Sequence, residues 1–365
     1  MLALGIFGGR VLLVDEATGE ERWAVQAHAG AIGAVMLPTQ VAMSPSGRFV
    51  ASVGGEENWM LLDAAHGAER MAGAKHDGTG ACVCQVDERG HRVLQAECPE
   101  VAHIAGQRAL AFSPCGQRFA TGDVDGVVIL WDAETERAEQ RMQAGPEMVW
   151  YLSFTADGAR LACASGDGEI HVWDATTGAL LRTWDGEDTV TWVQFSPVNS
   201  SIVATVSLGE VTLWDVDSGE TLNTFMGCEF GFAVFSPDGR TIATASDAND
   251  LLLVDAATGT VRLTLVGHQG LLSAACFSVD DGSKLASASE DGTCKVWDSS
   301  TGALLRTIIV GDLIRGPNAV SWGRDWVRDT QRGVAFAMGH HPRLGEGSRV
   351  LALDAGVVRM ILDRV

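Results

Sequence analysis

Residues 284–307 have the sequence KLASASEDGTCKVWDSSTGALLRT. Apolar and polar side chains alternate in three short runs, which the turns Asp291-Gly292 and Thr301-Gly302 separate. Alternation broken by Asp-Gly and Thr-Gly turns indicates antiparallel β-hairpins. The same pattern recurs at 161–182 and 119–132, so the fold must be derived from a repeated unit.

An aspartate ends one strand of each unit and serves as a ruler along the chain. These aspartates are Asp15, Asp63, Asp132, Asp174, Asp215, Asp255, Asp298 and Asp354. Four consecutive intervals, from Asp132 to Asp298, are 40–43 residues long. A period of about 40–45 residues is typical of the four-stranded blades of a propeller.

Three short motifs recur in phase with this ruler. Trp-Asp pairs begin at Trp131, Trp173, Trp214 and Trp297. Ser-Pro-x-Gly turns begin at Ser44, Ser113 and Ser236, and Ala-His or Gly-His pairs contain His28, His103 and His268. The sequence therefore resembles a WD40-repeat protein over nearly its whole length. The resemblance implies an all-β fold, a β-propeller of four-stranded antiparallel blades, in a single domain over 1–365.

The two ends of the chain decide the expected number of blades. The end contains four apolar strand-like runs, which we interpret as a degenerate last blade at about 312–365. The start supplies only a second, a third and a fourth strand. Eight blades leave one inner strand missing, whereas seven leave three apolar strands without a place. We therefore expect eight blades with an incomplete first blade, and seven blades, the commoner form of the family, are the alternative.

One interval is too long for a regular repeat. The distance from Asp63 to Asp132 exceeds the next interval by about 27 residues, so we expect an insertion at about 64–90. We interpret 81–87 (ACVCQVD) as an extra hairpin on one face and 91–98 (HRVLQAEC) as the outer strand that leads to His103. Insertions in propellers lie in loops, which often carry function. A decorated edge without a partner is an equally good interpretation.

The family resemblance also implies a hydrogen-bonded tetrad inside each well-formed blade. It joins a His before the first strand, a Ser or Thr in the second, an Asp in the next turn and the Trp of Trp-Asp. Two repeats match at every position: His103, Thr121, Asp125 and Trp131, and His268, Ser287, Asp291 and Trp297. Buried polar groups need such partners, so we predict a structural role for these residues.

No residue pattern predicts catalysis, a metal or a cofactor. The His-Asp-Ser sets recur with the repeat, and the chain has no GxSxG elbow, so a hydrolase is disfavoured. Cys82 and Cys84 lack a second pair at metal-ligand spacing. Adjacent His340 and His341 are interpreted as solvated loop residues. We expect a protein that is not an enzyme and holds no cofactor or metal.

Composition and charge restrict the partners. The net charge of −21 repels nucleic acid and anionic membranes as a whole and attracts basic peptides. The alternative is that the charge only maintains solubility. The eight cysteines are scattered, which favours a reduced, cytoplasmic protein, with the nucleus left open. The N-terminus lacks the basic flank of a signal peptide, and no apolar stretch reaches the roughly 18 residues of a membrane span.

The resemblance places partner binding on the narrow top face of the propeller. This face is formed by the loops that enter each inner strand and by the turns after each second strand. Alignment of the repeats puts the following candidates there: Arg108, Met148, Trp150, Thr191, Leu271, Ser273 and Glu290. We hypothesise that Trp150 anchors an apolar side chain of a peptide, because Trp and Arg often dominate interface energies. The alternative is that Trp150 folds over its own blade.

The most favoured function is a non-enzymatic scaffold or adaptor that presents this rigid top face to partner proteins or peptides. We expect a monomeric propeller within a larger complex. A ubiquitin-ligase receptor is disfavoured, because the second position after each Trp-Asp is not Arg. Two other classes stay open: an enzyme or small-molecule-binding propeller that uses its central channel, and an RNA-associated assembly factor with a local patch at Arg324, Arg328 and Arg332.

Overall fold

The computed structural model describes residues 2–6, 10–14, 21–26, 40–54, 58–76, 80–86, 92–94, 107–186, 188–227, 231–278, 281–289, 291 and 293–309. Every regular element in these ranges is a β-strand, so the prediction of an all-β fold is confirmed. The strands form antiparallel sheets in which strands that are consecutive in sequence pair with each other.

Five sheets have four strands each, and each sheet is one unit of the sequence repeat. The first contains β10 (Gln107–Phe112), β11 (Arg118–Asp123), β12 (Val127–Asp132) and β13 (Arg137–Gln143). The second contains β14 (Val149–Phe154), β15 (Arg160–Ser165), β16 (Glu169–Asp174) and β17 (Leu180–Asp185). The third contains β18 (Val190–Phe195), β19 (Ile202–Ser207), β20 (Glu210–Asp215) and β21 (Thr221–Met226). The fourth contains β22 (Ala233–Phe235), β23 (Thr241–Ala245), β24 (Leu251–Asp255) and β25 (Val261–Leu265). The fifth contains β26 (Leu272–Phe277), β27 (Lys284–Ser289), β28 (Thr293–Asp298) and β29 (Leu304–Ile309).

Two further sheets precede these five. A three-stranded sheet contains β1 (Leu2–Ile6), β2 (Arg10–Val14) and β3 (Glu21–Gln26). A six-stranded sheet contains β4 (Gln40–Met43), β5 (Phe49–Gly54), β6 (Asn58–Asp63), β7 (Glu69–His76), β8 (Gly80–Val86) and β9 (Arg92–Leu94).

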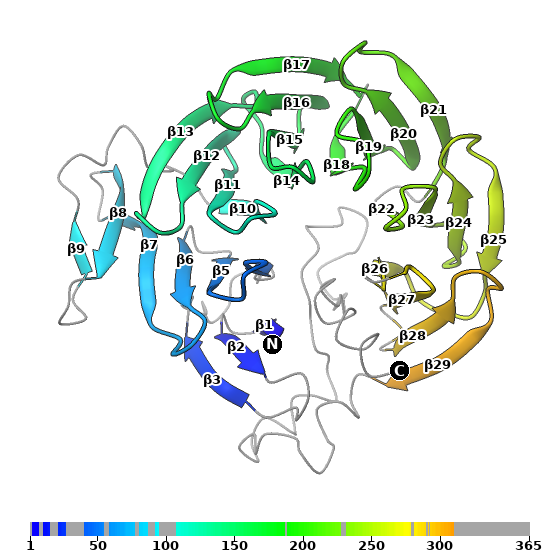
Figure 1. Cartoon of the computed structure of the whole chain (residues 1–365), viewed down its shortest axis with the longest axis horizontal. Coiled ribbons are helices and arrows are strands. Elements are labelled where there is room, and N and C mark those ends of the chain that lie inside the picture. Colours follow the sequence, from blue (N-terminus) through cyan, green and yellow to red (C-terminus); the bar gives the residue numbers. More distant parts are fainter. Residues whose placement is uncertain are drawn as a thin grey trace, which may run out of the picture.

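The seven sheets follow one another around a ring (Figure 1). The first strand of each four-stranded sheet lies toward the centre of the ring and the fourth lies on its outside. Neighbouring first strands contact each other, as β10 contacts β14 and β14 contacts β18. The predicted architecture of four-stranded propeller blades is confirmed. The expected last blade at 312–365 lies outside the described residues, so eight blades with seven as the alternative stays a prediction.

Among the described residues, the three-stranded sheet has no strand at its innermost position. Strand β1 contacts β4, the first strand of the next sheet, in the same way that β11 contacts β14 and β15 contacts β18. These contacts put β1 in the second position of its sheet. An incomplete first blade is what the sequence predicts.

The six-stranded sheet differs from the expectation at the long interval. Its fourth strand is β7, which lies within the stretch assigned to the insertion, and β8 and β9 continue the same sheet beyond β7. Strand β8 is therefore the fifth strand of this sheet rather than part of a hairpin on one face, and β9 forms the outer edge rather than taking the fourth position. Backbone pairing at an open sheet edge explains this arrangement, because the outer edge of β7 offers unpaired N–H and C=O groups.

The aspartates of the ruler close the turns between third and fourth strands. The Oδ1 atom of each accepts hydrogen bonds from the backbone N–H groups two and three residues further on, at 2.6–3.1 Å. The residues concerned are Asp132, Asp174, Asp215, Asp255 and Asp298. This side-chain capping of a turn explains why an aspartate recurs at these positions.

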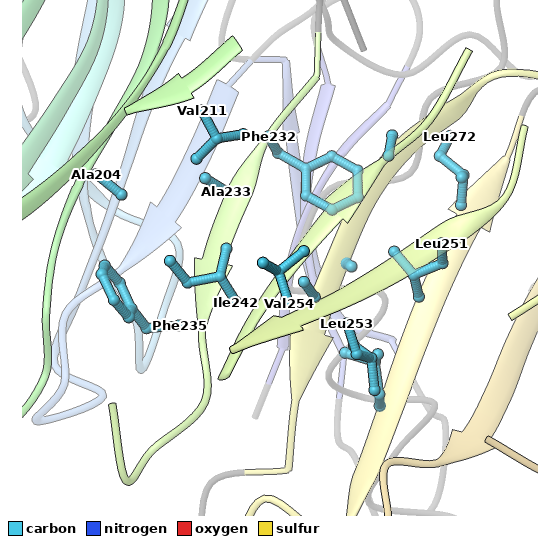
Figure 2. Close-up of a cluster of buried hydrophobic side chains, with 14 of the residues drawn as sticks. Ala204, Val211, Phe232, Ala233, Phe235, Ile242, Leu251, Leu253, Val254 and Leu272 are labelled. Carbon is cyan, nitrogen blue, oxygen red and sulfur yellow. The ribbon is translucent and has the colours of Figure 1, made fainter. Parts of the chain in front are cut away.

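The hydrophobic core lies between consecutive sheets. The largest cluster joins the sheets β18–β21, β22–β25 and β26–β29 and includes Phe232, Ile242 and Leu253, all at most 1% exposed (Figure 2). Each such side chain contributes about 1.5–3 kcal/mol when it is removed from water. Clusters of this kind join each of the four sheets from β10–β13 to β22–β25 to both of its neighbours and hold their loops in fixed positions.

Candidate partner-binding surface

One blade contains the complete hydrogen-bonded tetrad. In the sheet β26–β29, His268 Nδ1 lies 2.9 Å from Asp291 Oδ2 and His268 Nε2 lies 2.8 Å from Ser287 Oγ. The indole N–H of Trp297 donates to the same Ser287 Oγ at 2.9 Å. These distances fit a neutral imidazole that donates to Asp291 and accepts from Ser287.

The surroundings of this tetrad shift the pKa values of both ionisable members. Burial lowers the pKa of His268, although Asp291 acts in the opposite direction. Burial alone would raise the pKa of Asp291, but hydrogen bonds from Thr293, Gln269 and His268 outweigh it and lower this pKa to about 2. An ionised Asp291 and a neutral His268 therefore form a stable pair near neutral pH, with no group left free for catalysis.

The second predicted tetrad is described only in part. The indole N–H of Trp131 donates to Thr121 Oγ1 at 2.8 Å. His103 lies outside the described residues. The backbone N–H of Asp125 donates to Asp123 Oδ1 at 3.0 Å, and Asp125 itself is exposed.

A related pair was missed from the sequence. The indole N–H of Trp214 donates to Thr205 Oγ1 at 2.9 Å, in a blade that has no His at the position of His268. The separation of these residues is one shorter than in the complete sets. A tryptophan with a hydroxyl residue on the adjacent strand was the only available signal.

The blade β14–β17 replaces the tetrad by packing. Buried Cys163 takes the place of the hydroxyl residue, and Gly145 takes the place of the histidine. A Cβ atom at Gly145 would lie 1.8 Å from Asp167 Oδ2, so the carboxylate of Asp167 fills the space that a larger side chain would need. The ring of His171 stacks on Trp173 with centroids 5.4 Å apart.

Four of the predicted top-face residues occupy one structural position. Arg108, Trp150, Thr191 and Ser273 are each the extra residue of a β-bulge between the first and second strands of their sheets. Bulges redirect side chains and frequently lie beside binding sites. In the sheet β22–β25 the corresponding residue is Gly231, so this sheet has no side chain at that position.

The side chain of Trp150 is only half-exposed. It packs against the cluster of Ile170, Trp184 and Val190 between two sheets, and its Nε1 is buried without a hydrogen-bond partner among the described residues. Thr191, Met148 and Leu271 are also half-buried. These positions favour the interpretation that Trp150 covers its own blade. The side chains of Arg108 and Ser273, and all of Glu290, lie outside the described residues.

Charge is distributed unevenly between the two faces of the ring. The loops of the top face from 123 to 292 contain no Lys or Arg in their sequence. They carry exposed carboxylates at Asp125, Glu147, Asp188, Glu210 and Asp247. A cationic group that approaches this face therefore meets no like charge from these loops.

Arginines lie at the opposite face, where they link neighbouring sheets. Arg160 pairs with Asp217 at 2.7 Å, and Arg48 pairs with Glu134. Arg160 begins the second strand of its sheet and Arg48 directly precedes the second strand of its own. Each acid lies two residues after the ruler aspartate of the next sheet. The sequence singled out Glu134 and Asp217 only as positions without Arg. Their pairing required knowledge of which sheets are neighbours.

Among the described residues there is neither a candidate metal site nor a candidate membrane-spanning helix. No group of three or more His, Cys, Asp and Glu side chains could hold a metal ion. In the same part of the chain, no helix has the length and apolar character needed to cross a membrane.

Comparisons with known proteins agree with the repeat. The family model described as "WD domain, G-beta repeat" matches residues 97–132, 140–174 and 259–298. Nuclear distribution protein PAC1 of Komagataella phaffii is 37% identical over 70 residues, which are 18% of this chain and 14% of that protein. WD repeat-containing protein 1 of Gallus gallus is 39% identical over 80 residues, 21% of this chain and 13% of that protein. COMPASS component SWD3 of Saccharomyces cerevisiae is 34% identical over 79 residues, 22% of this chain and 24% of that protein. The matches thus span at most about a quarter of these relatives.

Proposed function

Because the chain carries WD40 repeats, as the sequence predicts, we propose that it is a scaffold whose top face binds partner proteins or peptides. The observation that carries the proposal is the absence of Lys and Arg from the top-face loops between residues 123 and 292, together with their exposed carboxylates. This surface favours partners with basic side chains. SWD3 is by its name a component of an assembly, which supports a role within a larger complex.

The other two classes are less well supported. RNA would meet the same acidic loops, and its phosphates would be repelled. An enzyme in the central channel needs ionisable groups that are not already paired, and the complete tetrad of His268 and Asp291 is internally satisfied. We therefore also propose that the protein is non-enzymatic and intracellular. The free thiols of Cys115, Cys163 and Cys294 are consistent with a reducing location.

The test is affinity capture of partners by the whole chain, with quantitative mass spectrometry. We expect Glu147→Gln combined with Glu210→Gln to reduce partner recovery, and raising the salt concentration to reduce it for the unaltered chain. The control removes the same charge from the opposite face by Glu134→Gln combined with Glu220→Gln, where both acids are exposed. Equal loss in both pairs would leave no role for the top face, and no specific partner from any source lysate would contradict the scaffold.

A further inference from the structure

Exposed aliphatic side chains gather at the outer end of the top face, over the neighbouring sheets β18–β21 and β22–β25. Leu208 is 57% exposed in the turn between β19 and β20, and Met226 is 65% exposed at the end of β21. Val266 is 71% exposed and follows β25 directly. None of these three was singled out from the sequence, because their exposure depends on where each strand ends.

Backbone contacts join two of these residues into one surface, the Leu208 corner, defined by Leu208 and Met226. The N–H of Gly227 donates to the carbonyl of Gly209 at 2.6 Å, which holds the end of β21 against the turn that carries Leu208. A Cβ atom at Gly227 would lie 3.0 Å from Thr244 Oγ1, so this point also touches the next sheet. That sheet carries Val266 on its outer strand.

Carboxylates surround the Leu208 corner. Glu210 is paired with Met226 across β20 and β21, and Asp250 precedes the pair Leu251 and Leu265 and so lies opposite Val266. The acid and aliphatic pairs are thus equivalent positions of two adjacent blades. Ser207 Oγ donates to the carbonyl of Asp188 at 3.1 Å, which brings a further exposed acid to the turn.

Other blades do not share this combination. The outer-strand residue that corresponds to Met226 is Gln143 in the sheet β10–β13 and Asp185 in the sheet β14–β17. The exposed aliphatic residues are therefore not a requirement of the blade. The sheet β26–β29 has Ile309 at the same position, but it pairs with Thr293 instead of an acid, and of these three sheets only β18–β21 also has a large aliphatic residue, Leu208, in the turn between its second and third strands.

The backbone of Leu208 supports a selected role for its side chain. Leu208 has a φ of 45°, in the left-handed region that suits Gly and Asn and is costly for Leu. Two-residue hairpin turns of this kind prefer Asn-Gly, and Gly209 already fills the second position with a φ of 81°. A leucine with a strained backbone and an exposed side chain does not stabilise the fold.

We propose that the Leu208 corner binds a segment of a partner protein that presents aliphatic side chains next to Lys or Arg. This inference rests on the scaffold function proposed above and gives that function a location and a ligand chemistry. The aliphatic groups of the segment cover Leu208 and Met226. Its cations lie near Glu210 and Asp188, where no Lys or Arg of the surrounding loops competes. A second copy of this chain fits less well, because its net charge of −21 opposes approach to an acidic rim.

The probe is a short fluorescent peptide with alternating lysine and leucine, and its binding to the whole chain is followed by anisotropy. Two further peptides replace leucine by serine or lysine by glutamate. We expect only the lysine-leucine peptide to bind, and Leu208→Asn combined with Met226→Gln to weaken it about tenfold or more. The matched control is Leu305→Asn, which alters an aliphatic residue that is 48% exposed on the outer strand β29.

Leu208→Asn alone separates binding from folding. Asn suits the left-handed backbone, so we expect this variant to have a higher Tm and a weaker affinity for the peptide. Loss of affinity with an unchanged or higher Tm supports the proposal, because an unfolding variant would lower both.

Three results would overturn the inference. They are no binding of the lysine-leucine peptide to the unaltered chain, equal binding by the double variant, and equal weakening by Leu305→Asn. If affinity capture still recovers specific partners in those cases, the scaffold function stands and only the Leu208 corner is rejected. If capture also recovers none, the scaffold function fails with it.

Discussion

The buried hydroxyl group of Ser287 forms hydrogen bonds with two side chains. It serves both His268 Nε2 and Trp297 Nε1, whereas Thr205 serves the indole of Trp214. We expect Ser287→Ala to destabilise the fold more than Thr205→Val, by about 1–3 kcal/mol, because each buried polar group without a partner costs about that much. Urea unfolding of both variants measures the difference. Equal losses would mean that His268 finds another partner.

His171 predicts how stability responds to acid. Burial lowers its pKa below the ordinary value of 6.5, although Glu169 and Asp167 act in the opposite direction, and its Nδ1 has no hydrogen-bond partner among the described residues. The folded state thus binds the proton less well than the unfolded chain. Stability is full above 6.5 and falls as the pH drops below it. We expect His171→Leu to flatten the dependence of Tm on pH over this range, and an unchanged slope would assign the effect elsewhere.

At the scale of the element, the sequence predicts the hairpins but not which strands pair at a sheet edge or which side chains are buried. Alternation and Asp-Gly turns locate the strands, because both signals are local. The positions predicted for β8 and β9 were wrong, because β8 pairs with the outer edge of β7 and β9 pairs with β8. Such an edge exists only once the sheet has formed. Trp150 was a candidate for peptide binding at the surface, with packing over its own blade as the alternative. It is half-buried against a cluster that joins its own sheet to the next one, which belongs to another repeat.

Two glycines test how much a turn depends on its surroundings. Gly47 has a φ of 68° with nothing near its missing Cβ, whereas Gly145 has a φ of 99° and faces Asp167 Oδ2. We expect Gly47→Ala to cost about 1–2 kcal/mol from backbone strain alone. Gly145→Ala adds a steric clash with the carboxylate and costs more. Thermal unfolding compares the two variants, and similar losses would show that Asp167 moves aside freely.

At the scale of the whole molecule, the ring and its incomplete first sheet follow from the repeat. The location of charge does not follow from a net value of −21. That value predicted attraction of basic partners to the chain as a whole. The loops of one face between residues 123 and 292 carry carboxylates without Lys or Arg, and arginine pairs lie at the other face. Only the folded ring assigns each charged residue to a face. A partner that binds the top face should therefore lose affinity as the salt concentration rises, whereas the arginine pairs at the opposite face should stay formed.

The hydrogen bonds between sheets have a consequence for how such a chain can change its length. Trp192 Nε1 donates to the carbonyl of Ala233, and the N–H of Phe235 donates to Gln194 Oε1, so two sheets share each bond. Loss of one repeat would preserve the period of the sequence and yet leave donors of one neighbour facing the wrong acceptors of the other. Removal or insertion of a single blade is therefore expected to require matching changes in both sheets that meet at the new junction.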